Sequence, residues 1–81
     1  MGIRIVLIED DDGDAELVQA YLEDEPDQGF SLHHASLLEE GAALLGDGGA
    51  DVVLLDLGLP DSSGLTTFTS LHARFPDVPI I

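Results

Sequence analysis

Residues 3–10 have the sequence Ile-Arg-Ile-Val-Leu-Ile-Glu-Asp, a nearly continuous apolar run that stops abruptly on two acidic residues. An apolar run of this kind is typical of a β-strand that is buried on both faces of a parallel sheet. Residues 51–56, Asp-Val-Val-Leu-Leu-Asp, show a similar pattern and also end on an acid. The sequence therefore predicts two buried strands with carboxylates at their carboxyl ends.

Helical and strand patterns alternate along the rest of the chain. After the first strand, the sequence predicts a helix over about 14–23, a short strand over 30–34 and a second helix that begins at Ser36. A third helix is expected over about 63–75, and residues 78–81 open a fourth strand. Strands and helices that alternate in this way form an α/β fold with a parallel sheet and right-handed crossovers.

Polar and helix-breaking residues mark the expected helix ends. In chain order, these are Asp12 as the N-cap of the first helix, Ser36 and Glu39 as a capping box on the second, Gly46 as its end, and Ser63 and Pro76 as the start and end of the third. The apolar residues of the third helix are expected to face the core: Leu65, Phe68, Leu71 and Phe75.

The composition limits the class of protein. The chain has 81 residues, enough for one small domain, and its lack of cysteine excludes disulfides and thiolate metal sites. Arg4 and Arg74 are its only basic residues besides histidine, too few to neutralise the phosphates of a nucleic acid. No apolar run approaches the roughly 20 residues of a membrane span, and the start lacks the basic region of a signal peptide. We therefore expect no membrane insertion and a cytoplasmic location.

The chain is strongly acidic, with 17 Asp or Glu residues against 2 Lys or Arg and a formal net charge of −15. One interpretation is a soluble acidic domain that faces cationic partners. The other is adaptation to high salt. Repulsion among the negative charges destabilises the folded state in dilute buffer, and salt screens this repulsion, since the Debye length falls to about 3 Å at 1 M salt. The absence of lysine favours salt adaptation.

Three carboxylates are expected to meet at one edge of the sheet. Ligands bind beyond the carboxyl ends of the strands in an open parallel sheet, where Glu9, Asp10 and Asp56 stand. If the two buried strands are neighbours, these charges either raise one another's pKa or hold a cation. A hard ion such as Mg²⁺ prefers oxygen ligands of this kind. Acids at strand ends are also common as solvated loop residues, so position alone leaves both interpretations open.

The residues around this predicted cluster resemble a known family. Residues 5–11, Ile-Val-Leu-Ile-Glu-Asp-Asp, and residues 52–65, which include Leu-Asp-Leu-Gly-Leu-Pro-Asp and then Ser-Gly-Leu, are similar to the receiver domain of two-component response regulators. The similarity extends from the first strand to residues 78–81, which lead into the family's fourth strand. It implies a flavodoxin-like, doubly wound parallel sheet, incomplete at its C-terminal side, with residues 1–81 as the N-terminal portion of a receiver.

The resemblance also implies a role for each candidate site residue. Asp56 would accept a phosphoryl group from the phosphohistidine of a sensor histidine kinase or a phosphotransfer protein, which makes the domain a signalling switch rather than an enzyme. Asp10 would bind Mg²⁺ directly, Glu9 would bind it through water, and Gly58 would offer its backbone carbonyl. Asp11 would serve only as negative charge at the start of the first helix. A C-terminal output domain or a homodimer is a further expected association.

The sequence departs from the receiver pattern at its end. Receivers carry a Ser or Thr at the end of the fourth strand and a Lys at the end of the fifth, whereas this sequence ends at Ile81 and contains no Lys. We expect a truncated receiver rather than a complete natural protein of this length. A pseudo-receiver, which keeps the fold without turning over phosphate, stays open. A phosphohydrolase with a second Asp as acid/base is disfavoured, because Gly58 stands two residues beyond Asp56 and cannot shuttle a proton.

The three histidines are not expected to bind a metal. His33 and His34 are consecutive in a predicted strand, so their side chains point to opposite faces and cannot bind one ion together. His72 stands apart on the third predicted helix.

Added salt is expected to stabilise the domain. If the acidic surface is an adaptation to high salt, screening of the −15 charge raises the melting temperature as NaCl increases from dilute buffer. Thermal unfolding followed by circular dichroism over a series of NaCl concentrations measures this effect. A melting temperature that is already at its maximum in dilute buffer contradicts salt adaptation.

Overall fold

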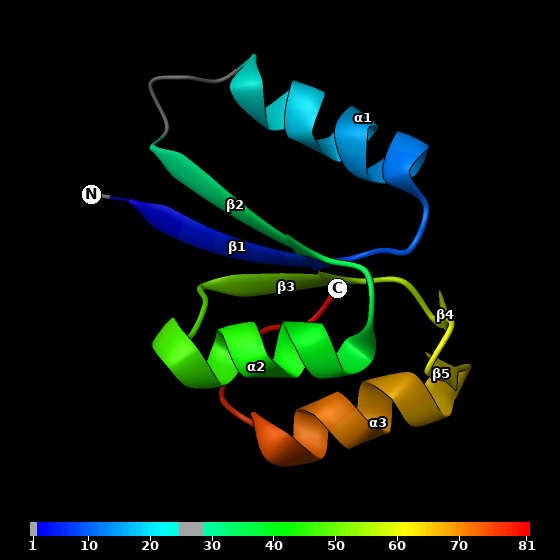
Figure 1. Ribbon diagram of the computed structural model, residues 1–81. Coiled ribbons are helices and arrows are strands. Elements are labelled where there is room, and N and C mark those ends of the chain that lie inside the picture. The colour runs from blue at the N-terminus through cyan, green and yellow to red at the C-terminus, as the bar shows by residue number, and fades with distance from the viewer. Residues whose placement is uncertain (1, 25–28) are drawn as a thin grey trace.

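A parallel β-sheet forms the centre of the molecule (Figure 1). The computed structural model describes residues 2–24 and 29–81. Its main sheet has the strand order β2-β1-β3, with β1 over Ile3–Ile8, β2 over Phe30–Ala35 and β3 over Val52–Leu55. Both pairings are parallel, and Ile8 lies opposite Ala35 on one side and Leu55 on the other. The prediction that the two apolar runs form strands of one parallel sheet is therefore confirmed.

Three helices of the described residues cover the two faces of this sheet. They are α1 (Asp12–Glu23), α2 (Leu38–Gly48) and α3 (Leu65–Arg74). Figure 1 shows α1 on one face and α2 and α3 on the other, which confirms the predicted α/β fold with a doubly wound sheet. Within the described residues, no helix has the length and apolar character that crossing a membrane requires.

A fourth strand begins beside β3, as predicted. Ile80 forms a parallel bridge with Val53. The Val53 N–H donates to the carbonyl of Pro79 at 2.9 Å, and the Ile81 N–H donates to the carbonyl of Val53 at the same distance. Along the main sheet, the chain thus runs strand, helix, strand, helix, strand, helix and the opening of a strand.

The main core lies between the sheet and the two helices α2 and α3, which cover one of its faces. Val6, Ile8 and Val53 contribute fully buried side chains from the two central strands. The buried residues that pack with them are Leu38, Ala42, Leu45, Leu59 and Leu71. Because the side chains of β1 alternate between faces, its continuous apolar run is needed to bury residues on both sides of the sheet.

Two helix starts differ from the prediction. Asp11, not Asp12, is the N-cap of α1, and its Oδ1 accepts from the Asp14 N–H at 3.0 Å. The α2 helix begins at Leu38 rather than Ser36, and the residue at its N-cap position, Leu37, makes no side-chain cap. The expected capping box is therefore absent.

The end of α2 and the start of α3 also differ from the prediction. The α2 helix continues past Gly46 to Gly48 and is followed by Gly49 with a φ of 70°. Ser63 does not cap α3, because it belongs to β5 (Ser62–Ser63), a two-residue strand that pairs antiparallel with β4 (Gly58–Leu59). Gly64, with a φ of 70°, occupies the N-cap position instead. The predicted end of α3 before Pro76 is confirmed, since the helix stops at Arg74.

The predicted apolar face of α3 is only partly buried. Leu71 is fully buried, Phe75 packs half-buried against the core, and Leu65 is 74% exposed. Phe68 is half-buried, stacks on His72 at 5.4 Å between ring centroids, and lines a hollow of about 180 Å³ with Leu65 and four other apolar residues. The prediction that all four apolar residues of this helix lie in the core is therefore wrong for Leu65.

Two glycines on α2 give a matched test of this packing. A Cβ on Gly41 would lie 2.6 Å from Cγ1 of Ile8 and closer still to its Cδ1, and Ile8 is fully buried. Gly41→Ala is therefore expected to destabilise the protein by about 1–3 kcal/mol through overpacking. A Cβ on Gly46 meets nothing within 4 Å, so Gly46→Ala is expected to stabilise the helix by about 0.5–1 kcal/mol. Urea denaturation of both variants measures the two signs, and equal effects would contradict this packing.

Candidate metal centre

The pairing of β1 with β3 brings three carboxylates together. Glu9 and Asp10 directly follow β1, and Asp56 directly follows β3. One carboxylate oxygen from each of these residues lies within 4.8 Å of the other two. The backbone ladder continues into this edge, because the Asp56 N–H donates to the carbonyl of Ile8 at 3.0 Å. The carboxylates therefore meet at the carboxyl edge of the sheet, where the sequence predicted them.

Gly58 fixes the orientation of Asp56. Its backbone N–H donates to Oδ1 of Asp56 at 3.0 Å, which closes a tight turn at the end of β3. The same glycine opens β4, and the Gly64 N–H closes the base of the β4–β5 hairpin by donating to the carbonyl of Leu57 at 2.6 Å. The sequence pattern over 57–62 predicts a loop instead of this hairpin. Two-residue strands are too short to give a periodic pattern, so the hairpin could not be found that way.

The pKa values of Glu9 and Asp56 are shifted in opposite directions. Burial, followed by a hydrogen bond to Asp56 and the charge of that residue, raises the pKa of Glu9 to about 7. The pKa of Asp56 is lowered, first by the Gly58 N–H and also by hydrogen bonds with Glu9 and Asp10. A proton shared by the cluster near neutral pH therefore resides on Glu9, while Asp56 stays ionised.

The donor set fits a small divalent cation. Three carboxylates on one edge need a proton or a cation between them. Both arginines of the chain lie elsewhere: Arg4 donates to backbone carbonyls at the end of α2, and Arg74 pairs with Glu39. A hard ion with oxygen ligands, such as Mg²⁺, suits these residues, and the exposure of Asp10 leaves room for the waters that Mg²⁺ retains.

The histidines lie outside the cluster, and one of them touches its backbone. His34 Nε2 lies 2.7 Å from the carbonyl oxygen of Glu9, and His33 Nε2 lies 3.1 Å from Nη1 of Arg4. The pattern of the sequence does not predict the contact of His34 with Glu9. The strand register explains this contact, because His34 pairs with Leu7, two residues before Glu9.

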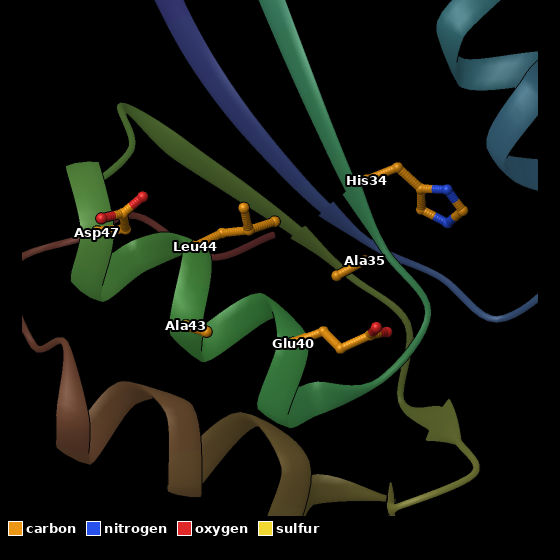
Figure 2. A pocket seen from close by; sticks show the side chains of 6 residues that line it. All are labelled: His34, Ala35, Glu40, Ala43, Leu44 and Asp47. Carbon is orange, nitrogen blue, oxygen red and sulfur yellow. The ribbon is translucent and has the colours of Figure 1, made fainter.

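A separate hollow of about 560 Å³ lies between β2 and α2 (Figure 2). Its lining residues are His34, Ala35, Glu40, Ala43, Leu44 and Asp47. Figure 2 shows the His34 ring on the side of β2 away from α2, so the ring and the two acidic side chains do not converge on one point. The acidic cluster, where side chains do converge, is the better candidate for chemistry.

Comparison with known proteins identifies the family. The fold and the acidic edge define a doubly wound α/β domain. A cluster of carboxylates that could hold a cation lies at the ends of its strands. A family model described as "Response regulator receiver domain" matches residues 5–81. The chain therefore belongs to the receiver domain family of response regulators, which confirms the resemblance seen in the sequence.

Individual relatives agree with this assignment. The cell cycle transcriptional regulator CtrA of Caulobacter vibrioides is 37% identical over 79 residues, which cover 98% of this chain and 33% of CtrA. The chain thus spans a third of the length of this relative. Among solved structures, the MaeR response regulator bound to beryllium trifluoride has a TM-score of 0.84 at 26% identity, over 100% of this chain and 65% of MaeR. A complex of histidine kinase ThkA with response regulator TrrA matches with a TM-score of 0.81 at 29% identity, over 99% of this chain and 66% of the matched chain.

Magnesium affinity is expected to depend on pH because the cation competes with the proton on Glu9. Since the pKa of Glu9 is raised to about 7, the carboxyl is protonated below that pH and ionised above it. Affinity should therefore rise about tenfold from pH 6 to pH 8 and change little above that. Calorimetric titration with MgCl₂ measures the affinity and the released proton.

A variant at Glu9 controls this experiment. Glu9→Gln removes the titrating group, so its weaker magnesium binding should be nearly independent of pH over the same range. An affinity of the unchanged protein that is equal at pH 6 and pH 8 contradicts the assignment of the shared proton to Glu9.

Proposed function

We propose that this receiver domain accepts a phosphoryl group on Asp56, with Mg²⁺ held by the carboxylates of Glu9, Asp10 and Asp56 and by the backbone carbonyl of Gly58. The observation that carries the proposal is the convergence of the three carboxylates within 4.8 Å in a chain of the receiver family. Within this proposal, Asp10 binds the ion directly and Glu9 binds it through water. Residues 1–81 form the N-terminal portion of the receiver, and the proposed compartment is the cytoplasm.

Asp56 has the properties of the nucleophile in this transfer. Its lowered pKa keeps the carboxylate ionised at neutral pH, and the Gly58 N–H holds one of its oxygens. A carboxylate oxygen of Asp56 forms a bond to phosphorus as the bond from phosphorus to the donor imidazole nitrogen breaks, and the imidazole keeps the electron pair. Bound Mg²⁺ offsets the negative charge that Asp56 and the phosphoryl group bring together.

The proposed donor is the phosphohistidine of a sensor histidine kinase or a phosphotransfer protein. The match to a response regulator solved in complex with a histidine kinase supports a partner of this kind. On this chain, α1 begins two residues after Asp10 and exposes 58% of Leu17 and 70% of Tyr21. These apolar side chains offer a protein partner a contact surface on the helix that begins beside the acidic cluster. An output domain or a homodimer is proposed by analogy with the longer relatives.

Replacement of Asp56 tests the proposed acceptor. With Mg²⁺ and acetyl phosphate, the whole protein should gain the mass of one phosphoryl group, and Asp56→Asn should abolish the gain because the amide is not a nucleophile. Asp77→Asn is a matched control, since Asp77 is exposed and lies after α3. Intact-protein mass spectrometry measures the modification.

The same experiment separates the alternative. A pseudo-receiver would bind Mg²⁺ without gaining mass. Modification that persists in Asp56→Asn and is lost in another carboxylate variant would assign the acceptor to a different residue.

A further inference from the structure

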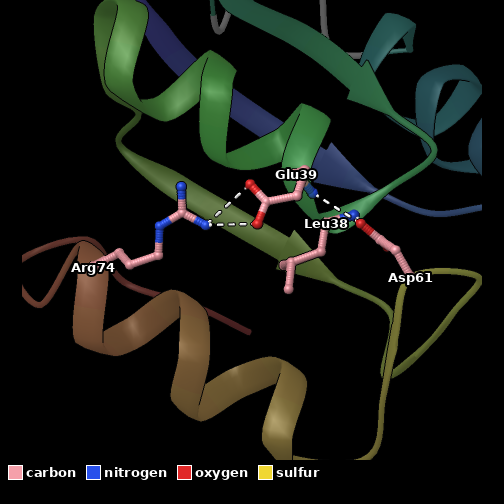
Figure 3. A network of polar contacts seen from close by, with 4 residues as sticks. All are labelled: Leu38, Glu39, Asp61 and Arg74. Carbon is pink, nitrogen blue, oxygen red and sulfur yellow. Dashed lines mark hydrogen bonds and ion pairs between the residues drawn. The ribbon is translucent and has the colours of Figure 1, made fainter.

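The N-terminus of α2 receives its cap from a residue on another element. Oδ1 of Asp61 accepts from the Leu38 N–H at 2.8 Å, and Oδ2 accepts from the Glu39 N–H at 3.1 Å (Figure 3). Leu37, at the N-cap position, has no side-chain oxygen to make these bonds itself. The first N–H groups of a helix have no partner within the helix, and its positive dipole end favours a carboxylate. Asp61 therefore replaces the missing local cap.

The titration of Asp61 agrees with this contact. Hydrogen bonds from the backbone N–H groups of Leu38 and Glu39 lower the pKa of Asp61, with Leu38 as the larger cause. The carboxylate is therefore ionised, and both of its oxygens accept, at neutral pH.

The end of α2 that Asp61 binds is held in place by two other contacts. Leu38 is buried in the main core, with 5% of its surface exposed. On the neighbouring residue, both carboxylate oxygens of Glu39 contact Nη1 of Arg74 on α3, at 3.1 and 3.3 Å (Figure 3). The first turn of α2 is therefore anchored in the core through Leu38 and paired with α3 through Glu39.

Asp61 lies in the turn of the β4–β5 hairpin. The same hairpin also contacts Asp56. At one end of the hairpin, Asp61 is tied to α2. At the other end, the Gly58 N–H holds Oδ1 of Asp56. Between them, Gly58 pairs with Ser63, and Leu59 is buried in the core. A displacement of Asp61 would therefore be transmitted through a short, paired segment to the peptide of Gly58.

We propose that Asp61 is a positioning residue for phosphoryl transfer, which by capping α2 holds the hairpin so that Gly58 keeps its contact with Asp56. This inference rests on the proposed function, because Asp56 and the Gly58 carbonyl are the acceptor and metal ligand named there. It adds that α2 and the acceptor loop move together, because they are joined by a carboxylate that lies outside the cluster of Glu9, Asp10 and Asp56.

A loss of the cap alone would destabilise α2, so the test must separate stability from positioning. Asp61→Ala removes both the cap and the tie. Leu37→Asp places a carboxylate at the N-cap position of α2 itself and can restore the cap without the tie to the hairpin. The double variant Leu37→Asp/Asp61→Ala, compared with Leu37→Asp alone, therefore reports the tie at matched helix capping.

The expected result is a split between two measurements. The melting temperature falls in Asp61→Ala and recovers in the double variant. The rate of modification by acetyl phosphate and the Mg²⁺ affinity fall about tenfold in Asp61→Ala and stay low in the double variant. Recovery of rate and affinity together with the melting temperature would overturn the proposal, because Asp61 would then be a helix cap and nothing more. Unchanged rate and affinity in Asp61→Ala would overturn it as well.

A second readout does not depend on phosphorylation. Amide hydrogen exchange of Gly58, followed by NMR in the absence of Mg²⁺, should speed up about tenfold in Asp61→Ala and in the double variant. Unchanged protection of this amide would overturn the positioning role. If the protein without substitutions gains no phosphoryl group, the proposed function fails. Faster exchange at Gly58 in the Asp61→Ala variants would still support the tie between α2 and the hairpin.

Discussion

The parallel pairing of β1 with β3 is the constraint on which the site depends. Val6, Ile8 and Val53 are fully buried, so a shift of register by one residue would turn these side chains to the opposite face of the sheet. The pairing of Ile8 with Leu55 then leaves the next residues, Glu9 and Asp56, side by side at the edge. Packing in the core therefore imposes a juxtaposition of negative charges that the charges alone would resist.

Neither arginine neutralises the carboxylates at the acidic edge of the sheet. Arg4 donates to the carbonyls of Leu44 and Gly49 at the C-terminal end of α2, where a cation suits the helix dipole. Arg74 pairs with Glu39 near the other end of the same helix. In a chain with a net charge of −15, both strong cations thus stabilise α2. The cluster is left to a proton on Glu9 or to a bound cation.

The sequence was sufficient for features that repeat locally or that a buried strand enforces. The apolar run of β1 and its acidic end predicted a strand and the convergence of Glu9 with Asp56, because parallel strands end at one edge. The cap of α2 could not be predicted, since Asp61 lies 23 residues from Leu38 and only the fold brings them together. Ser36 and Ser63 both fit local capping rules. In the structure, the distant carboxylate of Asp61 caps α2 in place of Ser36, and Ser63 belongs to a two-residue strand. Local rules therefore fail where a loop is held by tertiary contacts.

Glu9, Asp10 and Asp56 are proposed to share a single cation, and a paramagnetic ion tests this shared site most directly. Mn²⁺, which takes the same oxygen ligands as Mg²⁺, broadens the NMR signals of nearby residues. One equivalent is expected to broaden the amides of Glu9, Asp10, Asp56 and Gly58 together, and excess Mg²⁺ should restore them. Broadening that begins at the other acidic residues, or that reaches Asp10 and Asp56 at different metal concentrations, would contradict the shared site.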